Sequence, residues 1–548
     1  MLKYQPVPLP ERTVVTSSKS GKYVYLTQKV VYDPKRKCSY PKRIAIGKLN
    51  EEGLLIPNAN YFDLFPSEER LLDPGERSDF ISVGPHFVVN AIASKLQLDE
   101  LLSSVFKEDA DKILDIATYM MMTENGAMTY FADYGYGHSL FSGDNFSDNT
   151  IGILLKSLKV KDIDLFIRAW AKMHIKDSIY ICYDATNMNS AAGNLELAEY
   201  VHAKDDDTLP QINMSLGYDQ SDQTPPFYEL YPGSIIDNTE CKKMVERAKH
   251  YGCKKIGFIL DRGYFSLENI RYFERNGFDY LLMSKGNAKF IQEVIEEYGA
   301  VLKNGYSYYI RDHSLYGLTV EKKLFKTGKI QYIHLYYDGL RAEKEKLEIN
   351  EHYEKMDENL EAKVRQKLIR EKDVKAYKKY YRLRFDNNGY LIAYQRRDKE
   401  LRELINKTGY FTIISSQKMD AKKALEIYRN RDAIEKVFRM VKSYLGCDVF
   451  RVHSVERLES KVFLSFIALI IRNEIQKRLK PLYQKDRKNF TVPKVLRQYE
   501  RIGITKLSDN KYHIRYNLTK KQKQVLGIFS LKESDYKAFV KEIKDQIT

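Results

Sequence analysis

The chain opens with a region in which apolar and polar residues alternate. Between residues 21 and 46, the apolar positions include Tyr23 and Tyr25, and the turn-like pair Asp33 and Pro34 divides the region in two. A period of two is typical of strands with one buried face. The pattern therefore predicts a small β unit.

The pattern changes to a helical period from Gly84 to about Lys176. Phe87, Val88 and Ile92 recur at short helical steps, and similar apolar repeats follow further along. Apolar residues spaced by three and four positions form one face of a helix. This part of the chain is predicted to be helical.

A series of short apolar strands and amphipathic helices follows. The order β-β-β-α-β-α-β predicts a mixed sheet with helices on its faces. The expected strands are 178–183, 211–218, 227–231, 254–260 and 279–283, and the helices are 239–252 and 266–276.

Residues 286–408 interrupt this series with strand-like pieces and a long charged helical stretch, which indicates an insertion rich in β structure. A strand at 409–416, a long helix at 421–445 and an apolar helix at 459–478 are expected after it. The apolar run from Val462 to Ile471 is about half as long as a membrane span requires, so we expect a buried helix and no membrane partner.

Composition adds a preference for an anionic partner. The chain has 548 residues with 90 Lys and Arg against 74 Asp and Glu, a formal net charge of +16. Apolar residues make up 43% and aromatic residues 12%, which excludes a wholly disordered basic chain. The five cysteines are scattered without a C-x-x-C pair, and the start has no secretory signal, so we expect a reducing, cytoplasmic compartment.

Three basic regions each have two open interpretations. Basic residues of the N-terminal β unit face either DNA or solvent. The helical region at 84–176 either contains a helix-turn-helix-like reader of DNA or is simply packed helices. Residues 363–384 hold ten basic residues with interleaved tyrosines, which suits either nucleic-acid binding or a solvated helix.

Candidate chemistry rests on three acidic residues. Asp184 and Asp261 each follow an apolar strand, where active-site groups gather in such sheets, although Asp is also an ordinary turn residue there. Glu435 lies on the predicted helix 421–445. At 100° per residue, it shares a helix face with Tyr428, Arg431 and Lys442. Carboxylates that converge from different elements are the ligands that two-metal phosphodiester chemistry uses.

The spacing Tyr-(2)-Arg-(3)-Glu-(6)-Lys, present as Tyr428, Arg431, Glu435 and Lys442, resembles the signature of a large subgroup of bacterial insertion-sequence DDE transposases. Asp184 in YDATN and Asp261 in DRGYFSLENI resemble the first and second acidic motifs of that family. The resemblance covers roughly residues 170–472.

The resemblance implies an α/β fold: a ribonuclease-H-like catalytic core, a mixed sheet flanked by helices, that a β-rich insertion interrupts, with N-terminal β and helical DNA-binding regions. The expected parts are a small β region at 1–75, a helical DNA-end-binding region at 76–170, the core at 171–285 and 409–475, the insertion at 286–408 and a basic C-terminal region at 476–548.

The resemblance also implies roles for single residues. Asp184, Asp261 and Glu435 form the catalytic, metal-binding triad for two Mg²⁺ ions, which Mn²⁺ can replace. Arg431 and Lys442 hold DNA phosphates, Tyr428 lines the same groove, and Arg262 is a further candidate for DNA binding. Some relatives stack a flipped base on a tryptophan, but Trp170 precedes the first aspartate, so a Tyr or Phe is expected to take that role here.

The function implied is a transposase that binds the ends of its element, cuts the DNA with a metal-activated water and joins the freed 3′-OH to target DNA. Its partners are the terminal inverted repeats, the target DNA and a second copy in a homodimer, without a small-molecule cofactor, at the bacterial nucleoid. Two alternatives stay open: a ribonuclease-H-like nuclease without strand transfer, and a catalytically inactive DNA-binding protein descended from a transposase.

Overall fold

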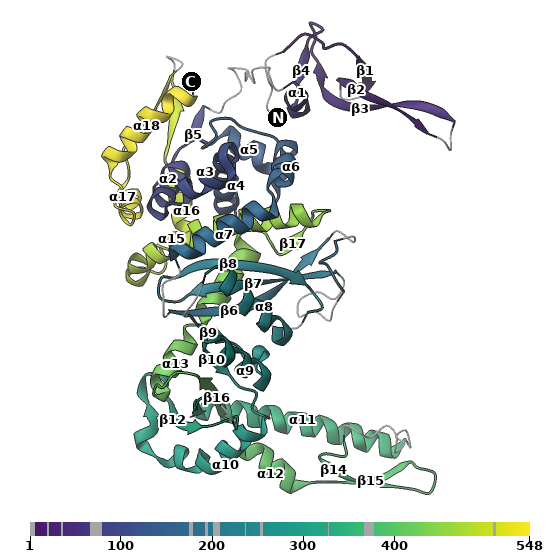
Figure 1. Ribbon diagram of the computed structural model, residues 1–548, viewed down its shortest axis with the longest axis vertical. Helices are drawn as coiled ribbons and strands as arrows, with labels where there is room; N and C mark the ends of the chain where they lie inside the picture. Colours follow the sequence, from purple (N-terminus) through teal and green to yellow (C-terminus); the bar gives the residue numbers. More distant parts are fainter. Residues whose placement is uncertain are drawn as a thin grey trace. The chain divides into compact units, whose positions relative to one another are not determined.

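The structure is a computed structural model that forms two compact units. Unit 1 comprises residues 1–176, 185–235 and 434–548, and unit 2 comprises residues 177–184 and 236–433. The structure describes residues 6–18, 21–33, 37–65, 79–174, 179–191, 195–200, 209–235, 237–252, 256–326, 328–366, 377–507 and 511–547. Figure 1 shows the elements of both units.

Unit 1 begins with a four-stranded antiparallel sheet, which confirms the small β unit predicted from the alternating pattern. Its elements are β1 (Thr13–Ser18), β2 (Gly21–Asp33), β3 (Cys38–Leu49), β4 (Leu55–Pro57) and α1 (Ala59–Leu64). The buried side chains of Val24, Ile46, Leu55, Tyr61 and Phe62 form its core. The apolar positions of the alternation thus meet on one face.

The helical region that follows is confirmed as well. It consists of α2 (Gly84–Leu96), α3 (Leu98–Phe106), α4 (Ala110–Thr123), α5 (Phe131–Tyr136), α6 (Asp148–Ser157) and α7 (Val160–His174). Trp170 is fully buried in α7, where its indole Nε1–H donates to the carbonyl of Pro225 at 3.0 Å. A side chain held in this way is not available for stacking on a DNA base.

A long buried helix, α15 (Val455–Lys485), packs against α4, α6 and α7 in the centre of unit 1. Residues Val462–Ile471 are buried all round, as the apolar run predicted. Among the described helices, none combines the length and apolar character needed to span a membrane. The C-terminal part adds α16 (Val492–Glu500), α17 (Lys520–Gly527), α18 (Glu533–Ile547) and a small sheet of β5 (Phe80–Ser82), β18 (Gly503–Lys506) and β19 (Tyr512–Ile514).

Unit 1 also contains an antiparallel hairpin, β7 (Gln211–Asp219) and β8 (Thr224–Pro232), whose strands are almost entirely buried. The sequence pattern predicts both strands, but it places the pair Pro225 and Pro226 in the connection between them. The structure places both prolines at the start of β8 instead. Proline is tolerated near the start of a strand, where a missing ladder hydrogen bond costs least.

Unit 2 is built on a mixed sheet, and the predicted order β-β-β-α-β-α-β is confirmed along the chain. The first residues of β6 (Ile179–Ser190), then β9 (Ile256–Leu260) and β10 (Asp279–Met283) run parallel. The sheet continues antiparallel through β16 (Tyr410–Ser415), β13 (Gln331–Tyr337), β12 (Leu315–Lys322) and β11 (Tyr309–Ile310). The accompanying helices include α8 (Asp237–His250), α9 (Leu267–Asn276) and α10 (Lys289–Asn304). The protein therefore has a mixed α/β fold with a large sheet.

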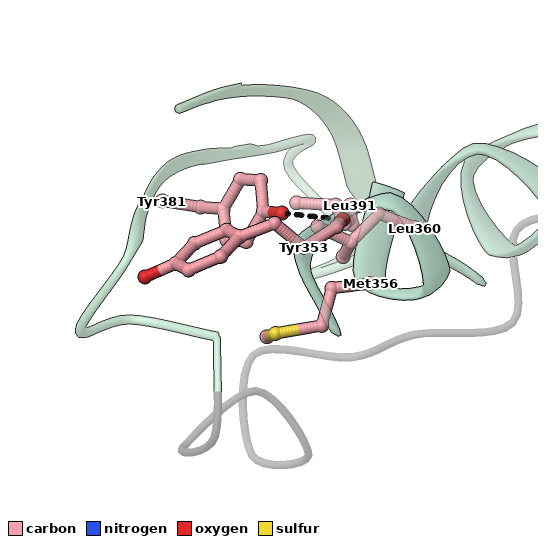
Figure 2. Close-up of a cluster of buried hydrophobic side chains, with 5 residues drawn as sticks. All are labelled: Tyr353, Met356, Leu360, Tyr381 and Leu391. Atoms are coloured by element: carbon pink, nitrogen blue, oxygen red, sulfur yellow. Dashed lines mark hydrogen bonds between the residues drawn. The ribbon is translucent and has the colours of Figure 1, made fainter. Parts of the chain in front are cut away.

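The remainder of the expected insertion is a small layer beside a long helix. It contains α11 (Gly339–Arg365), the hairpin of β14 (Tyr381–Phe385) and β15 (Leu391–Arg396), and α12 (Asp398–Asn406). Figure 2 shows its core, in which Tyr353, Met356 and Leu360 of α11 meet Tyr381 and Leu391 of the hairpin. The Tyr381 hydroxyl donates to the Tyr353 carbonyl at 3.4 Å. This segment thus has an apolar core of its own.

Tyrosines of the basic stretch 363–384 take part in this core. Residues 367–376 of it lie outside the described part of the chain. Tyr381 is buried, and Tyr377 and Tyr380 pack against the same cluster. The tyrosines that suggested base stacking therefore serve packing, which leaves the basic side chains as the support for nucleic-acid binding by this stretch.

Asp115 in α4 provides a test of packing in unit 1. Its carboxylate is 1% exposed and accepts hydrogen bonds from the backbone N–H groups of Phe141 at 2.6 Å and Ser142 at 3.0 Å. Burial raises its pKa to about 7. Because the folded state holds the proton more tightly than the unfolded state, this group's contribution to stability is full in acid and decreases as the pH rises towards 7.

We therefore expect Asp115→Asn, which resembles the protonated acid, to flatten this dependence. Between pH 5 and 7, the free energy of unfolding of unit 1 should fall by about 2 kcal/mol more in the wild type than in the variant. Denaturant titrations that follow the fluorescence of Trp170, the single tryptophan, measure this directly. Equal pH profiles for the two proteins would contradict the expectation.

Candidate active site

Strand register in unit 2 brings Asp184 and Asp261 to the same level of the sheet. Strands β6 and β9 are parallel neighbours, and Cys182 pairs with Ile259. Each aspartate lies two residues beyond this pair. Because side chains alternate between faces with a period of two, the two carboxylates emerge at one level and on one face of the sheet.

The two aspartates differ in their local structure. Asp261 directly follows the last residue of β9, as predicted, and it caps the short helix η3 (Arg262–Tyr264) by accepting from the Arg262 N–H at 2.6 Å. Asp184 was expected at the end of a strand, but β6 continues to Ser190. The prediction of a strand end was wrong because Asn189 and Ser190 continue the ladder by pairing with β17 (Val449–Phe450).

One arginine connects the two carboxylates. The Arg431 Nη1 atom donates to Asp184 Oδ2 at 3.0 Å and lies 3.8 Å from Asp261 Oδ2. The arginine side chain is only 12% exposed, and that of Asp184 18%. Charge-assisted hydrogen bonds of a guanidinium are strong when water is partly excluded. Arg431 therefore offsets part of the negative charge of two carboxylates that would otherwise repel each other.

Tyr428 completes this group. Its hydroxyl donates to Asp261 Oδ1 at 3.1 Å, and its ring centroid lies 5.7 Å from the Arg431 guanidinium carbon. Burial, followed by the negative charge of Asp261, raises the pKa of Tyr428 well above its usual value. The phenol consequently keeps its proton and acts as a donor to Asp261.

The helix that carries these residues is anchored at both ends. It is α13 (Ala421–Arg429), and its N-cap Asp420 accepts from the Lys423 N–H at 2.8 Å. The Tyr336 hydroxyl donates to the Ala421 carbonyl at 2.7 Å, which joins the helix to β13. At the other end, Arg429 bonds His313 at 2.7 Å. These contacts fix the direction in which Tyr428 points.

The long helix predicted over residues 421–445 is interrupted, which is a correction. After α13 the Arg431 N–H bonds Tyr428 and the Ala433 N–H bonds Asn430, both over three residues and not four. The chain continues as α14 (Asp432–Arg439) and a π-helical turn (Met440–Tyr444). The helical face calculated at 100° per residue therefore does not hold across the interruption or the wider π turn.

Comparison with known proteins decides the family. A family model described as the transposase DDE domain matches residues 177–471, more than half of the 548 residues. The chain belongs to the DDE transposase family. No curated protein matches this transposase. A solved structure described as a piggyBac transposase synaptic complex with hairpin DNA matches with a TM-score of 0.37 and 10% identity over 76% of each chain.

The remaining predicted residues of this transposase lie on the expected elements. Glu435 is exposed on α14, and Lys442 is half-buried in the π-helical turn. Both belong to unit 1, whereas Asp184 and Asp261 belong to unit 2. Among the described residues, no three His, Cys, Asp or Glu side chains come close enough to hold a metal ion. The convergence of the full triad stays a prediction.

Sequence reasoning missed the partners of the signature residues. Arg431 and Tyr428 were expected to face DNA, and in this structure Arg431 donates to Asp184 and Tyr428 donates to Asp261. The spacing of the signature carries no signal of these contacts, because they depend on the register of β6 against β9. Arg262 is exposed at the start of η3, where a DNA contact stays a prediction.

The phenol contact can be tested by Tyr428→Phe. Removing the hydroxyl leaves Asp261 Oδ1 with one donor fewer, so the end of α13 should open more readily. Since the aspartate is 41% exposed, we expect backbone amides at residues 425–429 to exchange about three- to tenfold faster. Hydrogen exchange with mass spectrometry measures this. Tyr309→Phe, at an exposed tyrosine, is the control, and equal rates in all three proteins would contradict the assigned contact.

Proposed function

We propose that this transposase mobilises an insertion sequence. It binds the ends of its element, hydrolyses a phosphodiester to free a 3′-OH, and directs that hydroxyl to a phosphodiester of target DNA. The observation that carries the proposal is the pair of aspartates on adjacent strands, which share one cationic nitrogen within 3.8 Å. We further propose a ribonuclease-H-like core, the bacterial insertion-sequence subgroup and action as a homodimer on paired ends.

The aspartates suit divalent cations. Mg²⁺ prefers oxygen ligands, and the carboxylates of Asp184 and Asp261 already surround a single positive charge. Asp184, Asp261 and Glu435 would hold two Mg²⁺ or Mn²⁺ ions, which would supply an activated water and stabilise negative charge on the reacting phosphate. Glu435 follows Arg431 by four residues, so chain connectivity alone keeps their Cα atoms within about 14 Å.

The chain's own residues bind and orient the DNA in this proposal. With a divalent cation bound to the aspartates, the guanidinium of Arg431 would be able to bond a DNA phosphate beside them. Lys442 is proposed to contact a further phosphate, and Arg262 the flanking backbone. Tyr428 keeps its proton and can donate to Asp261 throughout, which holds that carboxylate in one orientation.

The triad is tested by the conservative variants Asp184→Asn, Asp261→Asn and Glu435→Gln. Each should abolish both cleavage and joining of end DNA in Mg²⁺, because each removes a charged ligand but keeps its size. DNA binding should persist, since it depends chiefly on basic residues. Gel assays with end DNA and a target plasmid measure both steps. Cleavage without joined products would favour the nuclease alternative, and an active variant would exclude that residue from the triad.

The contact of Arg431 with the two aspartates can be tested by measuring metal binding in the absence of DNA. If its guanidinium competes with metal for the two aspartates, Arg431→Ala should bind Mn²⁺ about tenfold more tightly than the wild type. Titration calorimetry measures the affinity. Arg429→Ala is a matched control, because Arg429 lies on α13 but bonds His313. Unchanged or weaker binding by Arg431→Ala would show that no such competition occurs.

A further inference from the structure

The hairpin of β2 and β3 extends beyond the sheet to which it belongs. Strand β1 pairs with β2 only as far as Leu26, and β4 pairs with β3 only from Gly47 onwards. Past these points the Thr27 N–H still donates to the Arg12 carbonyl at 3.2 Å, and β2 and β3 then pair with each other up to the pair of Asp33 with Cys38. Figure 1 shows this two-stranded extension. We call residues 27–33 and 37–43 the β ribbon.

The β ribbon concentrates positive charge. Residues 29–43 contain six Lys and Arg against one Asp, a net charge of +5 in a short segment. Lys29 faces Lys42 directly across the two strands, and Arg43 follows at once. All three side chains are exposed, and none forms an ion pair with a side chain that the structure describes. Like charges placed opposite each other destabilise a strand pair, so folding alone does not explain them.

Apolar side chains on the β ribbon are exposed as well. Val30 is 65% exposed, Tyr32 59% and Tyr40 49%. They lie outside the core of this sheet, which consists of Val24, Ile46 and Leu55 with residues of α1. A two-stranded hairpin without a packed face is marginally stable in water. Both the charge and the exposed apolar surface would be relieved by an anionic partner that also offers apolar contacts.

We propose that the β ribbon inserts into the major groove of duplex DNA. This groove is about 12 Å wide and admits a two-stranded ribbon. Lys29, Lys42 and Arg43 then neutralise phosphates along its walls, while Tyr40, which lies on the same ribbon face as the opposed pair Lys29 and Lys42, contacts sugars and base edges. The inference rests on the proposed function for its choice of DNA as partner, and it assigns the contact to a surface outside the catalytic residues.

The test uses the full chain with Lys29→Ala, Lys42→Ala and Arg43→Ala combined. Its affinity for duplex DNA of random sequence is measured over a series of salt concentrations. Loss of three phosphate contacts should lower the slope of log affinity against log salt by about 2 to 3. The matched control combines alanine at Lys532, Lys537 and Lys541, which are exposed on or next to α18 and carry the same total charge. The control should keep the wild-type slope.

A second variant separates groove insertion from simple charge attraction. Tyr40→Ala should weaken DNA binding several-fold at every salt concentration and leave the slope unchanged. Circular dichroism checks that the variants fold, and removal of the opposed lysines should not destabilise the hairpin. The inference would be overturned if the triple alanine variant of the β ribbon had the same salt dependence of DNA affinity as the wild type. It would also be overturned if the ribbon variant and the α18 control lost the same amount of DNA affinity.

These experiments distinguish a failure of the proposed ribbon contact from a failure of the proposed transposase function. A protein that binds DNA through the β ribbon but never joins DNA strands would contradict transposition and support the ribbon contact. If the wild type cleaves and joins DNA but the triple alanine variant of the β ribbon binds DNA as tightly as the wild type, transposition is supported and the ribbon contact is contradicted. If the ribbon variant loses binding only to anionic phospholipid vesicles, the surface serves a membrane and the inference is wrong.

Discussion

The candidate site depends on electrostatic compensation between two carboxylates and one guanidinium. Parallel pairing of β6 with β9 places Asp184 and Asp261 side by side, where two negative charges would repel each other. Arg431 offsets part of this charge through one nitrogen atom, which donates to Asp184 and lies 3.8 Å from Asp261, and the hydroxyl of Tyr428 donates to Asp261 from a second direction. Carboxylates that lie close together repel each other when no metal ion is bound. A basic side chain beside them reduces the loss of stability that this repulsion causes.

This compensation explains why the signature is spaced as it is in this chain. Tyr428 lies in the last turn of α13 and Arg431 lies in the interruption just after it, so both reach the aspartates from the C-terminal end of α13. An unbroken helix would rotate Arg431 by about 300° from Tyr428, whereas the three-residue hydrogen bonds at Asn430 alter that rotation. The interruption is thus part of how the group is assembled.

Much of the fold could be predicted from the sequence, because periodicity records which face of an element is buried. The N-terminal alternation, the helices after Gly84 and the order of strands and helices around Asp184 and Asp261 all follow from it. The strand end expected at Asp184 and the continuous helix over 421–445 were wrong. In both cases pairing with residues distant in the chain, or a local change in hydrogen bonding, overrides a pattern that is purely local.

The side-chain partners of the site were beyond sequence reasoning for a related reason. Residue types showed that Arg431 and Tyr428 suit phosphate or carboxylate, and only strand register selects the carboxylates. Tyr381 illustrates the same limit: among basic residues it suggests base stacking, yet it is buried against Leu391 and Tyr353. Sequence thus identifies chemistry better than it identifies partners.

Charge is handled in opposite ways at the candidate site and at the β ribbon. At the site, Arg431 brings a positive charge to Asp184 and Asp261, and the neutral hydroxyl of Tyr428 donates to Asp261. On the ribbon, Lys29 faces Lys42 in water with no described counter-ion, an arrangement that costs stability and gives the fold nothing in return. Uncompensated charge of this kind lowers stability unless a partner supplies the opposite charge. A polyanion such as DNA supplies it, and binding is further favoured because the polyanion releases its condensed counter-ions.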